Sequence, residues 1–162
     1  MTILFAVDLS EPRAVVQWAE QFAEKLGAEL LVLHVDVPVD ELTNAPVEPF
    51  SGIGIFDPYQ MYDPSTREEI ETSREHAFED FVHQQFSGPV RPALRQGDPA
   101  DTIIEDAHEE DVDLIILGKR RHPMLERLLI GSVARSVVEN TDIPTVLVPI
   151  PELEENEAEN SS

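Results

Sequence analysis

The sequence predicts an α/β domain in which a parallel sheet carries helices on both faces. Short apolar runs, typical of strands buried on both sides, alternate with longer stretches whose apolar residues recur at helical spacing. A length of 162 residues with 41% hydrophobic side chains suits one domain with a substantial core. The alternation predicts a doubly wound sheet, which binds ligands at the carboxyl ends of its strands, where the strand order reverses.

The first elements form a strand–helix–strand unit. Residues 2–8 are expected to be a buried strand ending at Asp8, and Ser10 is expected to cap the helix that follows. Gly27 is expected to end that helix before a second strand at 29–35. The expected buried face of the helix consists of Ala14, Val15, Trp18, Ala19, Phe22, Ala23 and Leu26.

A long loop is predicted at residues 36–66, which contain five prolines and two glycines. Two interpretations stay open, a segment that brings aromatic side chains to a ligand or an inert surface insertion. A helix is expected from Ser65 to about Phe86. His76 and His83 on this helix are interpreted as surface residues, because metal ligands need closer spacing and a carboxylate partner.

The next strand, residues 89–95, contains two prolines and is therefore expected at a sheet edge. A helix capped by Asp98 with Pro99 at its first position should follow. The acidic residues of this helix are attributed to the helix dipole rather than to a metal site. A last strand is expected at 145–150, and residues 151–162 are expected to be an acidic, disordered tail.

The stretch 114–135 carries the strongest functional signal. An apolar strand, 114–117, is expected to stop at Gly118, a cationic loop follows, and Gly131 with Ser132 opens a helix. Small residues at a helix start let backbone N–H groups approach a phosphate. Five of the 11 Lys and Arg residues fall in the 17 positions 119–135, which favours an anionic ligand. Alternatively, these cations pair with surface carboxylates, and the glycines and Ser132 only shape the chain.

Composition narrows the class of protein. The net charge is −22, and lysine occurs only at positions 25 and 119, which we interpret as adaptation to a salty cytoplasm. The alternative is simply an acidic protein with an acidic tail, since residues 152–159 hold five of the carboxylates. Such a surface disfavours nucleic acid and anionic membranes as partners. The absence of cysteine excludes disulfides and thiol chemistry. No stretch suggests a membrane span or signal peptide, so we expect a cytoplasmic protein.

These residues resemble the universal stress protein family over residues 2–150, with the segment Gly131, Ser132, Val133 and Ala134 as the most specific match. The resemblance implies a five-stranded parallel sheet in the order 3-2-1-4-5, of the Rossmann-like, adenine nucleotide alpha hydrolase-like class. It also implies a homodimer formed through the last strand, here Thr145–Ile150.

Many members of that family bind ATP through a glycine motif, which this chain matches at Gly118, Gly131 and Ser132. The motif's second glycine is Arg121 here. Its side chain either blocks backbone approach to the phosphates or supplies a guanidinium group to them. Carried over residue by residue, the resemblance implies an ATP site, with or without Mg²⁺, made of Asp8, Val35, Leu117, Gly118, Arg121, Gly131, Ser132 and Val133.

The sequence therefore predicts an ATP-binding regulatory protein of the stress response, with little or no catalysis and no catalytic or metal-binding residue. The alternative is a non-nucleotide interaction protein of the same fold, which Arg121 favours and in which Asp8 is only a turn acid. An enzyme is disfavoured because no P-loop and no nucleophile elbow are present. His122 is the sole candidate for a general base.

Overall fold

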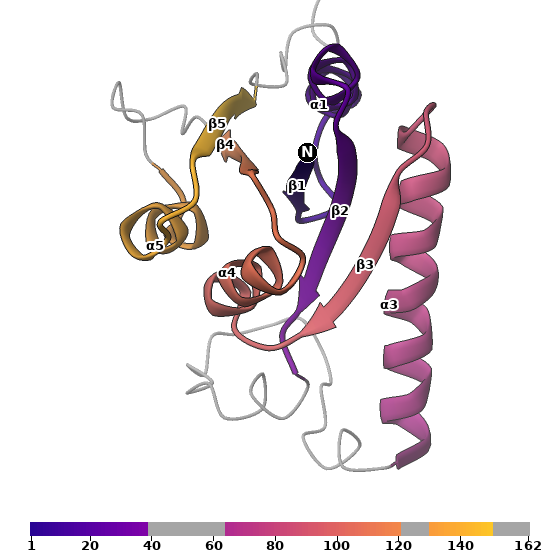
Figure 1. Ribbon diagram of the computed structural model, residues 1–162. Helices are drawn as coiled ribbons and strands as arrows, with labels where there is room; N and C mark the ends of the chain where they lie inside the picture. Colours follow the sequence, from indigo (N-terminus) through magenta and orange to yellow (C-terminus); the bar gives the residue numbers. More distant parts are fainter. Residues whose placement is uncertain (39–63, 121–129, 151–162) are drawn as a thin grey trace, which may run out of the picture.

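The computed structural model describes residues 1–38, 64–120 and 130–150 and contains a five-stranded parallel sheet (Figure 1). The strand order is β3-β2-β1-β4-β5, as the resemblance implied. In the described part, no helix has the length and apolar character needed to cross a membrane. The elements are β1 Thr2–Val7, α1 Arg13–Leu26, β2 Glu29–Asp36, α3 Pro64–Gln85, β3 Arg91–Gln96, α4 Pro99–Glu109, β4 Leu114–Arg120, α5 Ser132–Asn140 and β5 Thr145–Ile150.

Helices cover both faces of the sheet because alternate strand residues point to opposite sides. On β1, Ile3 and Phe5 pack under α1 and α3, whereas Leu4 packs under α4 and α5. All three side chains are fully buried. The strands are therefore apolar in continuous runs, which is the pattern from which the doubly wound sheet was predicted.

Helix ends follow the local sequence at two of three predicted positions. Gly27 ends α1 in the left-handed conformation (φ 62°), and the Asp98 side chain accepts a hydrogen bond from the Asp101 N–H at the start of α4. The predicted cap at Ser10 is wrong, because α1 begins after Pro12, which lies in extended conformation. The Ser10 hydroxyl donates to the Asp8 carboxylate instead.

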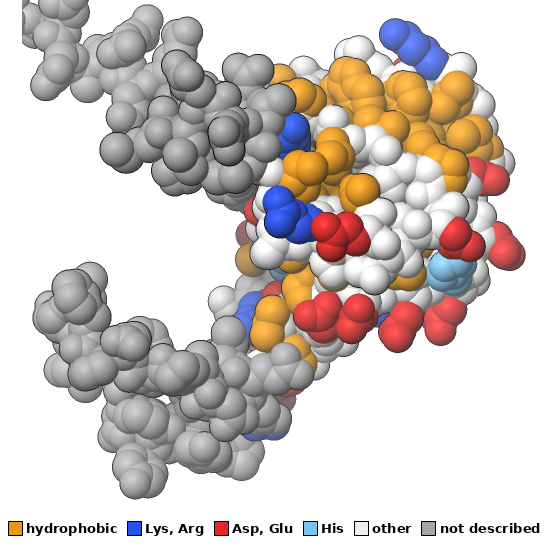
Figure 2. All heavy atoms as spheres, turned by 90° about the vertical axis from the view of Figure 1, so that its left-hand side faces the viewer, with side chains coloured by type: hydrophobic (Ala, Val, Ile, Leu, Met, Phe, Trp, Pro, Cys, Tyr) orange, Lys and Arg blue, Asp and Glu red, His pale blue; other side chains and the backbone are white. Residues whose placement is uncertain are grey.

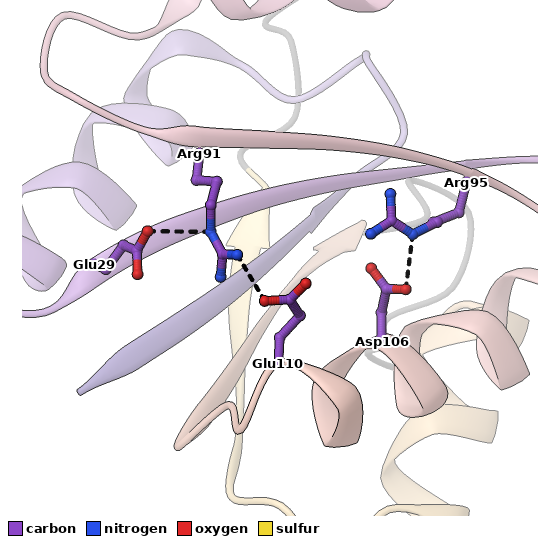
Figure 3. A network of polar contacts seen from close by, with 5 residues as sticks. All are labelled: Glu29, Arg91, Arg95, Asp106 and Glu110. Carbon is purple, nitrogen blue, oxygen red and sulfur yellow. Dashed lines mark hydrogen bonds and ion pairs between the residues drawn. The ribbon is translucent and has the colours of Figure 1, made fainter.

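The edge strand β3 is tied to α4 and β2 by ion pairs, which Figure 3 shows from close by. Arg91 contacts Glu29 (Nε–Oε1 3.1 Å) and Glu110 (Nη1–Oε2 2.6 Å), and Arg95 contacts Asp106 (Nε–Oδ1 2.9 Å). The hydrogen bond that Arg91 donates to Glu110 raises the pKa of Arg91. Asp106 is buried, so the second pair is shielded from solvent on its acidic side. β3 is at the edge, as the prolines of the predicted strand 89–95 indicated, although it begins at Arg91 and contains only Pro92.

Several predicted boundaries and faces need correction. The long loop is shorter than 36–66, since β2 includes Asp36 and α3 begins at Pro64; residues 39–63 lie outside the described part. The tail 151–162 also lies outside it. Trp18 is 37% exposed and stacks on Phe22 (ring centroids 5.0 Å apart), so it lies at the rim of the predicted apolar face of α1.

The apolar face of α5 is narrow. Ala134 and Val137 are buried, but Val133 and Val138 are exposed. Positions 134 and 137 lie about one turn apart and pack in the core cluster that includes Ile115 and Leu117 of β4. Val133 is therefore placed where it can line a cavity rather than fill the core.

Candidate functional site

A cavity of about 210 Å³ lies at the carboxyl ends of β1, β2 and β4. β1 lies between β2 and β4, so this is the point where the strand order reverses and where doubly wound sheets bind their ligands. The lining residues are Ala6, Val7, Asp8, Glu11, Leu33, His34, Val35, Pro99, Ile103, Leu117, Gly118, Val133 and Ala134.

Most of the predicted site residues meet in this cavity. Asp8, Val35, Leu117, Gly118 and Val133 all line it, although they come from four different elements or their ends. Chain topology alone brings them together, since parallel strands end at the same edge of the sheet.

Two predicted residues lie beside the cavity rather than in its wall. Gly131 immediately precedes α5 and Ser132 is the first residue of that helix. A Cβ at Gly131 would meet no atom of the described residues within 4 Å. Gly131 occupies the N-cap position and has no side chain to accept hydrogen bonds from the first N–H groups of the helix. Arg121 lies outside the described residues.

The segment after β1 forms a tight turn around Asp8. The Ser10 N–H donates to the Asp8 carboxylate (2.9 Å), and the Asp8 N–H donates to Oε1 of Glu11 (2.8 Å). Leu9, between them, has φ 70°, a conformation that costs energy for a residue with a Cβ. The two side-chain hydrogen bonds hold this turn and thereby fix Asp8 at the cavity.

Glu11 is the functional candidate that the sequence analysis missed. Its side chain is only 6% exposed, although it is a carboxylic acid. Burial raises the pKa of Glu11 to about 7; the hydrogen bond from the Asp8 N–H opposes this rise, and the nearby Asp8 charge adds to it. The available signal was an acid three residues after another acid at the end of a buried strand.

His34 connects two strand ends at the same cavity. Its Nδ1 lies 2.8 Å from the Val7 carbonyl oxygen on β1, and its Nε2 lies 3.3 Å from the carboxylate of Asp36. The ring also stacks on Phe78 of α3, with centroids 5.9 Å apart. A carbonyl only accepts hydrogen bonds, so Nδ1 carries a hydrogen. His34 therefore fixes the wall of the cavity and leaves no ring nitrogen free for a ligand.

Gly118 has a different environment from the one predicted. β4 does not stop there but continues to Arg120, because β5 pairs with it as far as Ile150. The predicted loop at 119–122 is therefore strand at its first two positions, and the remaining two lie outside the described part. A Cβ at Gly118 would lie 2.9 Å from Cδ1 of Ile150, so packing alone already favours glycine at this position.

A larger groove of about 640 Å³ lies at the opposite end of the sheet, between α1 and residues 87–90. Its main polar group is Glu20, whose Oε1 accepts hydrogen bonds from the N–H groups of Ser87 and Gly88. The carboxylate thus secures the chain between α3 and β3. We therefore assign the functional site to the smaller cavity, where the strand ends and the predicted residues converge.

Comparison with known proteins adds to this geometry. The model of the universal stress protein family matches residues 1–149. Universal stress protein MJ0531 of Methanocaldococcus jannaschii is 27% identical over 136 residues, which cover 84% of this chain and 74% of that protein. A universal stress protein of Thermus aquaticus is 29% identical over 150 residues, which cover 91% of this chain and 97% of that protein.

Solved structures show the same fold. The structure of a universal stress protein in complex with cAMP has a TM-score of 0.55 at 19% identity, covering 92% of this chain and 96% of that one. The structure of a universal stress protein from Archaeoglobus fulgidus in complex with dAMP has a TM-score of 0.51 at 21% identity, covering 91% of this chain and 96% of that one. The family model spans nearly all of the chain, and the strand order agrees with it. This chain therefore belongs to the universal stress protein family.

Proposed function

We propose that this protein is a regulatory nucleotide-binding protein of the stress response and that ATP occupies the cavity at the ends of β1, β2 and β4. The observation that carries the proposal is the convergence of Asp8, Val35 and Val133 in one cavity beside the uncapped start of α5. Relatives of the same fold that bind cAMP and dAMP support an adenine nucleotide as the ligand class.

The shape of the site suggests how the nucleotide is divided. A volume of about 210 Å³ is smaller than the roughly 300–1,000 Å³ of typical ligand sites, so the cavity suits the nucleoside and leaves the phosphates outside. Val35 and Leu117 supply apolar contact for the base, and the Asp8 carboxylate accepts hydrogen bonds from ribose hydroxyls. The phosphates lie against the N–H groups at Gly131 and Ser132, where the helix dipole favours negative charge.

We propose regulation rather than turnover, and the groups around this cavity support this proposal. Its ionisable side chains within the described chain are Asp8, Glu11 and His34, and both His34 nitrogens already face protein acceptors. The described residues hold no cluster of three potential metal ligands, so any Mg²⁺ enters with the phosphates of ATP. We propose that the bound nucleotide changes the surface seen by a partner.

Calorimetric titration with ATP and Mg²⁺ at high salt tests this function. We expect the wild type to bind ATP and Asp8→Asn to bind it more weakly. Arg121→Gly restores the glycine of the motif and tests whether the arginine side chain affects binding. Weaker binding by Arg121→Gly makes the arginine a phosphate ligand, and unchanged binding removes it from the site. If the wild type does not bind but Arg121→Gly does, the side chain closes the site and the nucleotide proposal fails.

The alternative function is an interaction protein of this fold that binds no nucleotide. One observation favours it: packing against Ile150 already explains the glycine at position 118 without any ligand. Absence of ATP binding by both wild type and Arg121→Gly supports this alternative.

We also propose that two copies associate through β5. β5 is an edge strand, and such strands present unpaired backbone groups that a second strand can complete. Val146 and Leu147 on it are half-buried in the single chain. Figure 2 shows the molecule from the left-hand side of Figure 1. On this face, hydrophobic side chains gather in the upper part, and the carboxylates lie mainly lower.

Light scattering after size-exclusion chromatography tests this dimer. Leu147→Glu is expected to yield monomers because it places a charge at the strand edge. Pro149→Glu, at an exposed position of the same strand, repeats the test without disturbing the half-buried side chain. Ala77→Glu, an exposed position on α3 at the other side of the sheet, is the matched control. A dimer that survives both β5 substitutions places the interface elsewhere.

A further inference from the structure

Two carboxyl groups share one end of the cavity, and they differ in their surroundings. Asp8 is exposed, whereas Glu11 is 94% buried, since only 6% of it remains accessible. Oε1 of Glu11 accepts the Asp8 N–H at 2.8 Å. Oε2 is inaccessible to solvent and has no hydrogen-bond partner among the described residues. A buried carboxylate with an unpartnered oxygen is unfavourable unless a proton neutralises it.

The described groups around Glu11 include little that could stabilise its negative charge. β2 contributes His34 to the same cavity, and that ring is directed at the Val7 carbonyl and at Asp36. The contributions of α4, β4 and α5 to the cavity wall are Pro99, Ile103, Leu117, Gly118, Val133 and Ala134, none of which ionises. Asp8 is the nearest charge and has the same sign as ionised Glu11.

We propose that Glu11 is a positioning residue for Asp8 that takes up a proton when a nucleotide fills the cavity. This inference rests on the proposed function, because it names a regulation of that same site. The neutral acid keeps its Oε1 on the Asp8 N–H and turns its hydroxyl, Oε2–H, toward the Asp8 carboxylate. Asp8 then stays ionised and correctly directed to accept hydrogen bonds from the ligand.

Filling the cavity favours the neutral acid for two physical reasons. A ligand displaces water from the wall that includes Glu11, and loss of water raises the cost of its charge. The phosphates add negative charge nearby, which opposes ionisation further. Binding and protonation therefore assist each other, and the affinity should increase as the pH falls from about 8 to about 6. One linked proton changes affinity by up to about tenfold for each pH unit.

Calorimetry with cAMP measures this linkage directly, because its phosphodiester does not titrate near neutral pH. At about pH 7.5, titrations in two buffers with different heats of ionisation should reveal fractional proton uptake by the wild type. Glu11→Gln imitates the neutral acid, so it should bind with the wild type's low-pH affinity at every pH and take up no proton. Glu11→Ala should weaken binding at every pH, because Asp8 loses its support. Glu24→Gln, an exposed position on α1, should behave like the wild type.

The outcomes separate this inference from the proposed function. Binding of cAMP by the wild type with equal affinity at about pH 6 and pH 8, and without proton uptake, overturns the inference and leaves nucleotide binding intact. Failure of both cAMP and ATP to bind overturns the proposed function and the ligand linkage with it. A carbon NMR titration of the ligand-free protein tests the neutral acid separately. A titration midpoint of the Glu11 carboxyl group near that of exposed glutamates overturns the inference of a neutral acid, and a midpoint near pH 7 supports it.

Discussion

Replacing Glu11 by Gln should make the ligand-free protein more stable at high pH and leave it nearly unchanged at low pH. Burial raises the pKa of Glu11 from 4.5 to about 7 in the folded protein. The folded state therefore binds more protons than the unfolded state between these two values. The contribution of Glu11 to the free energy of unfolding is fully present below about pH 4.5 and is lost as the pH rises through about 7.

The size of the effect follows from the two pKa values. A difference from 4.5 to about 7, at about 1.4 kcal/mol for each pH unit, corresponds to about 3 kcal/mol. Gln does not titrate, yet its amide oxygen can accept the Asp8 N–H and its NH₂ group can donate to the Asp8 carboxylate. The free energy of unfolding of Glu11→Gln should therefore exceed that of the wild type by about 3 kcal/mol at pH 8 and by less than about 1 kcal/mol at pH 5.

Urea unfolding at constant KCl, followed by Trp18 fluorescence at several pH values, measures this difference. The other carboxyl groups titrate in both proteins, so subtracting one profile from the other isolates Glu11. Glu24→Gln should give a profile parallel to the wild type, because Glu24 is exposed. A Glu11→Gln difference that stays constant between pH 5 and pH 8 would refute the assignment of a buried, protonatable acid at this position.

Three further outcomes are expected from stability measurements. Arg95→Met leaves the buried Asp106 carboxylate without its partner and should lower the free energy of unfolding by about 1–3 kcal/mol. The same substitution should cost less in an Asp106→Asn background, and additive effects of the two substitutions in urea unfolding would contradict a direct pair. Gly118→Ala brings a Cβ to 2.9 Å from Cδ1 of Ile150 and should destabilise the protein by about 1 kcal/mol. Ile150→Val removes that methyl group and should reduce the cost, so an equal cost in the wild type and in Ile150→Val would show that this contact is unimportant. The melting temperature should decrease when the KCl concentration is lowered below roughly 1 M, because repulsion within a chain of net charge −22 is then unscreened. An unchanged melting temperature in dilute buffer would argue against adaptation to salt.

Much of the fold could be predicted because its signals are local. Continuous apolar runs identify the buried strands, and the prolines at 89 and 92 place β3 at the edge. Gly27 and Asp98 mark helix ends through their own backbone and side-chain chemistry. The strand order came from the family resemblance, because local patterns do not specify which strands pair.

The features that sequence analysis missed depend on contacts between distant or competing groups. Ser10 has the chemistry of a helix cap, but the Asp8 carboxylate is nearer and takes both its N–H and its hydroxyl. The strand at 114–117 was expected to stop at Gly118, but pairing with β5 extends it. Glu11 is buried because the turn after β1 folds it inward, and its spacing from Asp8 in the sequence does not by itself show this.

The proposed site also has to overcome the charge of its own protein. A net charge of −22 repels a nucleotide over distances that only salt can shorten, since the Debye length is about 10 Å at 0.1 M and about 3 Å at 1 M. At high salt, only groups close to the phosphates still matter. The uncapped start of α5 supplies partial positive charge there, and protonation of Glu11 removes a negative charge from the cavity wall. A strongly acidic protein can thus bind an anion when its local groups, rather than its net charge, determine the potential at the site.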